Sequence, residues 1–301
     1  MDVSNESNDI TKVTNHVHTV EIPVASKLEI FTFLINANEF NYTNACEYLL
    51  GSICNFALSR EIRVKYRDRP AVLAKKARNK FIEWKRNTGE LGEFLLFCFL
   101  EGHLNAPKIL SKLELKTSSE MYVHGADGLH YLRLPSGNYQ LLFGESKLNL
   151  DLTTGLREAF ISIKNFKEGI NDKGNEKSGI SFEKGLLTSN LEKEVTLAEE
   201  KDFLEKLIYP TSEEDAPIVD DAFGIFVGYE MNYDQQRKTL TNDQFRDYIN
   251  TTVKAEVESK KENIEKYINT YNLHGHSFYI YVLPFSKLDD SRKMMIKELI
   301  T

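Results

Sequence analysis

The sequence predicts an α/β protein in which a mixed β-sheet is flanked by helices. Patterns with helical spacing alternate with strand-like patterns along most of the 301 residues. The two longest apolar runs agree with this class, since residues 94–100 fit a buried helix and residues 278–285 fit a core strand. A chain of this length can bury one large core or two modest ones.

The first half of the chain carries most of the predicted strands. They span residues 17–25, 59–66, 112–116, 121–134 and 139–148. The predicted helices span residues 41–58, 70–86 and 89–102. Pro70 suits the first turn of its helix, because the N–H that proline lacks would have no intrahelical partner there.

The second half of the chain alternates helices and strands. A helix begins after Thr153 or Thr154, either of which can act as its N-cap. Further helices are predicted at 191–207, 242–271 and 290–300, strands at 223–229 and 278–283, and loops at 171–178 and 211–217.

The domain organisation follows from charge and pattern. We expect residues 1–86 to form an N-terminal helical and basic extension. Residues 87–301 would then form the core, with an acidic insertion at about 171–221, or the two parts would make a single compact domain.

Composition predicts a cytoplasmic protein that does not enter a membrane. No stretch approaches the roughly 18 apolar residues that a membrane span needs. The N-terminal residues lack the basic and apolar regions of a signal peptide. The three cysteines, Cys46, Cys54 and Cys98, form no C-x-x-C pair, which favours buried thiols in a reducing compartment.

Charge is distributed unevenly along the chain. Residues 60–86 hold eleven Lys or Arg against three acids, a net +8, so the rest of this chain of net charge −7 carries −15. We expect this basic block to neutralise phosphates, with Arg67, Lys75 and Arg78 as candidate DNA contacts, or else to be a solvated helix face. Residues 191–221 hold eleven acids against three lysines and predict a masking or partner-binding surface.

A group of carboxylates lies close to a lysine in the middle of the sequence. Glu145 and Lys147 are two residues apart on a predicted strand, so both side chains share one face. Asp127, between Gly125 and Gly128, would come from the preceding strand. Oxygen ligands beside an ammonium group are what metal-assisted phosphodiester hydrolysis requires. A structural Glu–Lys pair and a turn aspartate are the simpler interpretation of the same residues.

Strand register decides whether Asp127 can join Glu145. A four-residue loop at 135–138 would place Asp127 opposite Ser146. A three-residue loop, or a one-residue bulge near a glycine, would place it opposite Glu145.

The helix at 89–102 offers two acids, Glu90 and Glu93. Asn87 followed by Glu90 has the spacing of a capping box, which gives Glu90 a structural role. Glu93 has no such role and opens the apolar run, so we expect Glu93 to be the functional acid.

The order of a helix Glu, then Asp127, then Glu145-Ser146-Lys147 resembles the PD-(D/E)XK nuclease superfamily, without the proline that often precedes the aspartate. The strings GELGEFL, GADGLHYL and LLFGESKLN resemble the narrower HamA family of nuclease subunits from Hachiman anti-phage systems. The motif resemblance covers roughly residues 89–166. It implies a restriction-endonuclease-like core and a heterocomplex with a superfamily 2 helicase, HamB, that restrains the nuclease until infection or DNA damage.

Residue chemistry and resemblance together predict a metal-dependent DNase. Asp127, Glu145 and the Ser146 backbone carbonyl would bind Mg²⁺ or Mn²⁺, Lys147 would orient or activate water, and Glu93 would act through water from outside the metal's ligands. Two other interpretations of the function stay open. One is a catalytically inactive nuclease fold that binds a helicase, and the other is a site-specific restriction subunit.

Overall fold

A computed structural model describes residues 9–23, 25–82, 89–111, 113, 125–170, 174–175, 179–185, 191, 198–210 and 218–300. The predicted strand at 112–116, residues 121–124 of the next strand, and the loop at 211–217 fall mainly or wholly outside these ranges.

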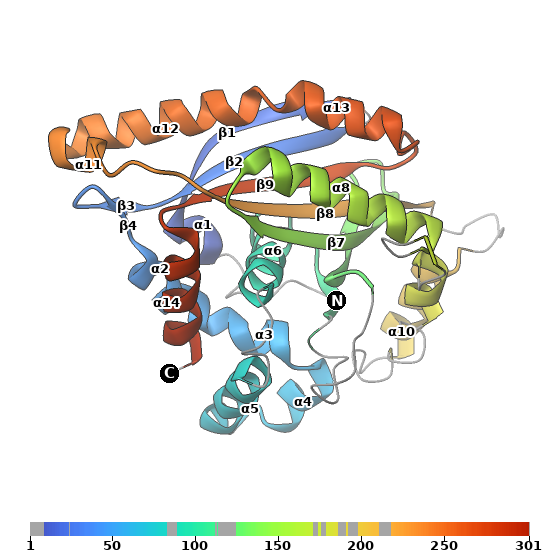
Figure 1. Cartoon of the computed structure of the whole chain (residues 1–301). Helices are drawn as coiled ribbons and strands as arrows, with labels where there is room; N and C mark the ends of the chain where they lie inside the picture. The colour runs from blue at the N-terminus through green and yellow to red at the C-terminus, as the bar shows by residue number, and fades with distance from the viewer. Residues whose placement is uncertain are drawn as a thin grey trace.

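A mixed sheet forms the centre of the molecule (Figure 1). Within the described residues it has seven strands in the order β1-β2-β9-β8-β7-β6-β5. Their bounds are Thr14–Ile22 (β1), Ser26–Phe33 (β2), Lys108–Ser111 (β5), Gly128–Arg133 (β6), Tyr139–Asn149 (β7), Val219–Glu230 (β8) and Phe278–Phe285 (β9). A separate two-stranded ribbon joins β3 (Ile35–Asn36) to β4 (Glu39–Phe40). The predicted α/β class with a mixed sheet is confirmed.

The middle of the sheet is parallel and buried on both faces. Strands β2, β9, β8 and β7 run parallel to one another, whereas β1, β6 and β5 pair antiparallel at the two sides. Every residue of β9 is buried, as the apolar run at 278–285 predicts for a parallel strand covered by helices on both sides.

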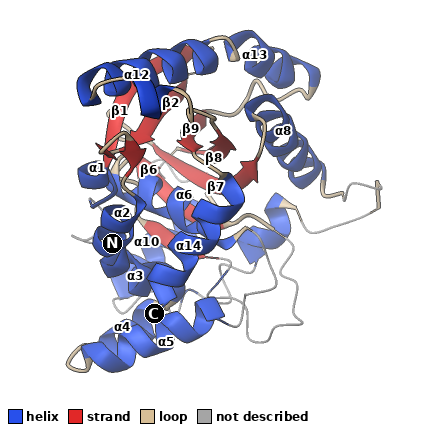
Figure 2. Cartoon of the chain, turned by 60° about the vertical axis from the view of Figure 1, so that its left-hand side comes forward, coloured by secondary structure: helices blue, strands red, loops and turns tan. Residues whose placement is uncertain are grey.

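Helices cover both faces of the sheet (Figures 1 and 2). One face carries α8 (Leu152–Glu168), α12 (Asn242–Glu258) and α13 (Lys261–Thr270). The other carries α1 (Asp9–Val13), α2 (Tyr42–Leu49), α6 (Glu90–Gly102) and α14 (Leu288–Ile300). Beyond this second layer lie the 3-10 turn Leu50–Ser52, α3 (Ile53–Ala57), α4 (Arg60–Lys65) and α5 (Pro70–Ile82), while α10 (Ala198–Ile208) and α11 (Gln236–Thr239) lie at the periphery.

The N-terminal part of the chain contributes to the central sheet. Strand β2 pairs in parallel with β9, and apolar residues from both halves of the chain join one core cluster. The division at residue 86 stays a prediction, and the boundary itself lies within 83–88, outside the described residues.

Several predicted elements differ in the structure. The segment 59–66 forms helix α4, because the Ser59 side chain caps it by accepting from the Ile62 N–H, and none of its residues is buried as a strand would require. The strand predicted at 17–25 is present as β1, but it spans Thr14–Ile22. Helix α8 is capped by Asp151 and not by Thr153 or Thr154. The helix at 242–271 is divided near Ser259, whose hydroxyl donates to the Glu256 carbonyl.

Candidate active site at the ends of strands β6 and β7

The hairpin between β6 and β7 has a three-residue loop, one of the two lengths that the sequence allowed. Leu134 N–H donates to the Asn138 carbonyl at 2.8 Å, so the loop holds three residues, 135–137. Gly137 N–H donates back to Leu134, and Gly137 has a φ of 89°, which only glycine adopts readily. The paired residues therefore run from Arg133↔Tyr139 to Leu129↔Phe143. This regular register does not continue to Asp127, because the Asp127 N–H donates to the Gly144 carbonyl at 2.8 Å, one residue out of register.

Asp127 lies where β6 gives way to the preceding turn. Strand β6 begins at Gly128, level with Gly144, so the last residues of β7 extend past its end. The Asp127 carboxylate occupies this edge and accepts two hydrogen bonds from Ser146, from its N–H at 2.8 Å and from its hydroxyl at 2.7 Å. Asp127 is 8% exposed. The buried Asp127 carboxylate therefore accepts the Ser146 N–H, which a further residue of β6 would otherwise accept.

The Ser146 carbonyl points toward the same edge. In a β-strand the N–H and C=O of one residue are directed at the same neighbouring strand. Since the Ser146 N–H is directed at Asp127, the Ser146 carbonyl is also directed at this side of β7. The predicted backbone ligand and the predicted aspartate ligand therefore lie along one edge.

Glu145 and Lys147 form an ion pair on β7. The Lys147 Nζ lies 2.6 Å from a Glu145 carboxylate oxygen. The side chain of Glu145 is 16% exposed and that of Lys147 is 27% exposed. The prediction that the two share a face is confirmed, because such a pair requires it.

The two faces of β7 hold different parts of the predicted site. Ser146 faces α6, because a Cβ added to Gly92 of α6 would lie 3.2 Å from the Ser146 hydroxyl. Alternation then places Glu145 and Lys147 on the face covered by α8. The structure brings Asp127 to Ser146 and Lys147 to Glu145, around the end of β7 that extends past β6.

Helix α6 delivers Glu93 to the Asp127 side of the sheet. Glu93 is 8% exposed and lines a small cavity together with Asp127, Gly128 and Gly144. Gly92 has no side chain to hold α6 away from β7. The acid also lies in the first turn of the helix, where the helix dipole favours a negative charge.

The capping-box assignment of Glu90 was wrong. Helix α6 has Gly89 as its N-cap and Glu90 as its first residue, so Glu90 is not at the third helical position. Asn87, the expected cap, lies outside the described residues. Glu90 is instead buried, at 4% exposure, and is absent from the cavity lining that includes Glu93.

His130 lies at the base of the same cavity. It is 2% exposed and its Nδ1 contacts the Ala106 carbonyl at 2.8 Å, which fixes Nδ1 as the protonated nitrogen of the neutral ring. Burial lowers the pKa of His130 to about 4.

We expect His130→Asn to flatten the pH dependence of stability. Below the ordinary imidazole pKa of about 6.5 the unfolded chain binds a proton that the folded chain excludes, so the wild type loses stability as pH falls from about 6.5 to about 4. The loss is on the order of 3 kcal/mol. Asparagine can still donate to Ala106 but does not titrate. Urea unfolding at pH 7 and pH 4 measures the difference, and the exposed His274→Asn serves as the control.

Pattern reasoning missed one acid beside this site. Residues 180–185 form a short helix whose Glu183 is 5% exposed. Its carboxylate fills the space that a side chain at Gly125 would need, two residues before Asp127. No spacing in the sequence joins Glu183 to the motif, because the contact is made only by the tertiary fold.

Of the candidate DNA contacts, Arg67 lies in the turn between the outer helices α4 and α5 (Figure 2), and Lys75 and Arg78 lie on α5. Arg67 and Lys75 are exposed, whereas Arg78 is half-buried. The acidic segment approaches this block, since Arg60 of α4 and Glu200 of α10 form an ion pair at 3.4 Å. The contact joins the two segments at one point, and the masking role of the acidic segment stays a prediction.

Comparison with known families gives one match that covers almost the whole chain. The model of a family described as HamA matches residues 8–299 of the 301. No curated protein matches the chain. Within the described residues, no helix is long and apolar enough to cross a membrane.

Proposed function

The chain belongs to the HamA family and is therefore a component of a Hachiman anti-phage defence system, and from this premise we propose that it is a metal-dependent deoxyribonuclease. The observation that carries the proposal is the end of the β6–β7 hairpin. There Asp127 accepts hydrogen bonds from Ser146, the residue between Glu145 and Lys147, and Glu93 lines the same cavity as Asp127.

The donor set fits a hard divalent cation. Asp127 and Glu145 offer carboxylate oxygens and Ser146 offers a backbone carbonyl, which are the ligand types that Mg²⁺ and Mn²⁺ take in proteins. When bound, such an ion would neutralise phosphate charge and raise the acidity of water at this edge. The two hydrogen bonds to Asp127 and the ion pair of Glu145 favour the charged forms that metal binding needs.

Lys147 and Glu93 would have supporting roles. The Lys147 ammonium is held by Glu145 and is 27% exposed, so it can orient water or meet a phosphate oxygen that gains charge during attack. Glu93 is fixed in a buried helix turn, where its carboxylate can hold a water molecule in the cavity.

The partner would be a superfamily 2 helicase like HamB, acting with this chain in the cytoplasm as one heterocomplex on DNA. The exposed basic residues of α4 and α5 offer phosphates a surface, and the acidic helix α10 contacts α4 through the Arg60–Glu200 ion pair.

A plasmid-nicking assay with purified chain tests this function. We expect Mg²⁺ or Mn²⁺ to support nicking and EDTA to abolish it. Complete absence of nicking with every divalent ion, both alone and with the helicase, would favour the inactive adaptor. Cut ends that share one sequence would favour a restriction subunit instead.

Glu93 and Glu90 provide a matched comparison within one helix turn. Glu93→Gln is expected to lower the cleavage rate about tenfold to a hundredfold, the usual range for an outer partner of a metal site. Glu90→Gln changes an equally buried acid away from the cavity, so its rate should stay near wild type. Nicking time courses measure both, and the reverse ranking would show that the wrong acid was chosen.

A further inference from the structure

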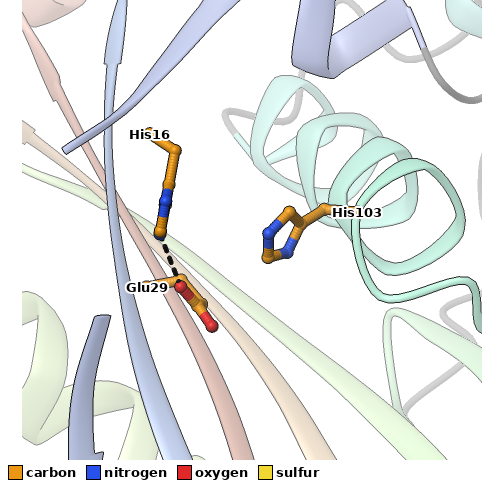
Figure 3. A group of neighbouring side chains, drawn as sticks. All are labelled: His16, Glu29 and His103. Carbon is orange, nitrogen blue, oxygen red and sulfur yellow. Dashed lines mark hydrogen bonds and ion pairs between the residues drawn. The ribbon is translucent and has the colours of Figure 1, made fainter. Parts of the chain in front are cut away.

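Two histidines and a glutamate converge at the other end of helix α6 (Figure 3). His16 comes from β1, Glu29 from β2, and His103 from the C-cap of α6. One ligand atom from each residue lies within 4.8 Å of the other two. The His16 Nε2 contacts a Glu29 carboxylate oxygen at 2.8 Å.

A β-bulge is what brings His16 to this group. Thr19 pairs with Glu29 and His18 with Ile30, but His16 then pairs with Phe31, so Val17 is an extra residue in β1. Residues three apart on a regular strand face opposite ways. The bulge puts His16 on the same face as Thr19 and Glu29, and bulges are frequent where a side chain is re-aimed at a site.

The surrounding groups orient the three side chains. The Thr19 hydroxyl donates to the same Glu29 oxygen at 2.6 Å. The Tyr281 hydroxyl lies 3.2 Å from His103 Nδ1, and in the tautomer whose Nδ1–H donates to Tyr281 the Nε2 lone pair can act as a ligand. Hydrogen bonds of this kind to the outer atoms of ligands are typical of metal sites.

The position of Glu29 gives a physical reason for a cation. The carboxylate is 6% exposed and lies between Leu28 and Ile30, and burying such a charge is costly without a positive partner. His16 is 42% exposed at its side chain, so an ion has a route in from solvent.

We propose that His16, Glu29 and His103 bind a divalent transition metal, with Zn²⁺ as the best fit. Two imidazoles and one carboxylate suit Zn²⁺ and other late first-row ions, whereas Mg²⁺ prefers oxygen alone. Three protein ligands leave one position for water. The ion would tie the edge hairpin β1–β2 to the end of α6.

This site is separate from the proposed nuclease site. Glu93 and His103 are ten residues apart on one helix and its cap, about 15 Å along the axis. The inference does not depend on DNA cleavage.

Metal binding by the purified chain tests the proposal, after EDTA treatment and dialysis. We expect one equivalent of Co²⁺ to give a visible d–d absorption band that Zn²⁺ abolishes by displacement. Zn²⁺ at a hundred times its dissociation constant should raise Tm by about 5 °C.

Variants separate this site from others on the chain. His16→Asn, on the exposed edge strand, and Glu29→Gln should each weaken Zn²⁺ binding at least about a hundredfold. His18→Gln is the matched control, because His18 lies on the same strand but pairs with Glu258. His18→Gln should bind Zn²⁺ like the wild type. Failure of the wild type to bind Zn²⁺, undiminished binding by His16→Asn, or loss in the His18 control would overturn the proposal.

Discussion

Glu145→Gln is expected to abolish metal-dependent DNA cleavage, with a rate about a thousandfold below wild type. The change removes a negative charge from the predicted ligand set but keeps the size of the side chain. It also removes the charge that pairs with Lys147 at 2.6 Å, a partly exposed pair whose loss should change stability little. Nicking rates and Tm measured on the same preparation separate loss of chemistry from loss of fold.

The Lys147→Ala variant separates Mg²⁺ binding from DNA cleavage at the predicted site. Losing the lysine should leave Mg²⁺ binding in place and remove cleavage, whereas losing Glu145 should weaken both. The surface pair Lys164–Glu168 on α8 is the matched control, since Lys164→Gln or Glu168→Gln removes an ion pair of similar type away from the site. Wild-type nicking by Lys147→Ala would mean that the site is assigned to the wrong residues.

Reversing three charges of the basic block should have the second-largest effect. The combined variant Arg67→Glu, Lys75→Glu and Arg78→Glu is expected to weaken DNA binding and to flatten its salt dependence by about one slope unit per lost phosphate contact. Arg67 and Lys75 are exposed, so two of the three reversals need no repacking. Binding isotherms at several salt concentrations measure the slope.

A control variant must change net charge equally on the opposite side of the sheet. Lys238, Arg246 and Lys266 are exposed on α11, α12 and α13, which lie far from α4 and α5 in Figure 1. Reversal of these three charges should leave the salt slope near wild type. An equal loss of DNA binding in both variants would indicate a general charge effect and would remove the basic block as a specific surface.

The sequence was most informative where chemistry follows local geometry. Period-2 alternation placed Glu145 and Lys147 on one face, and the ion pair confirms it. The sequence did not determine the register of the β6–β7 hairpin, because it allowed a loop of either three or four residues. The hydrogen bond between Leu134 and Asn138 shows that the loop holds three residues.

Other features depend on contacts between distant segments. Residues 59–66 alternate like a strand, yet Ser59 caps a helix there. Glu183 reaches Gly125 across 58 positions of sequence, and the bulge at Val17 is visible only from the pairing of β1 with β2. No local pattern encodes such contacts.

The position of a bound Mn²⁺ ion tests the central claim most directly, and anomalous scattering from Mn²⁺-soaked crystals measures it. We predict a peak about 2 Å from carboxylate oxygens of Asp127 and Glu145 and from the Ser146 carbonyl, with the Ser146 N–H released from Asp127 if the aspartate turns toward the ion. A peak confined to other residues, with Asp127 still bonded to Ser146 and Glu145 still bonded to Lys147, would contradict the account.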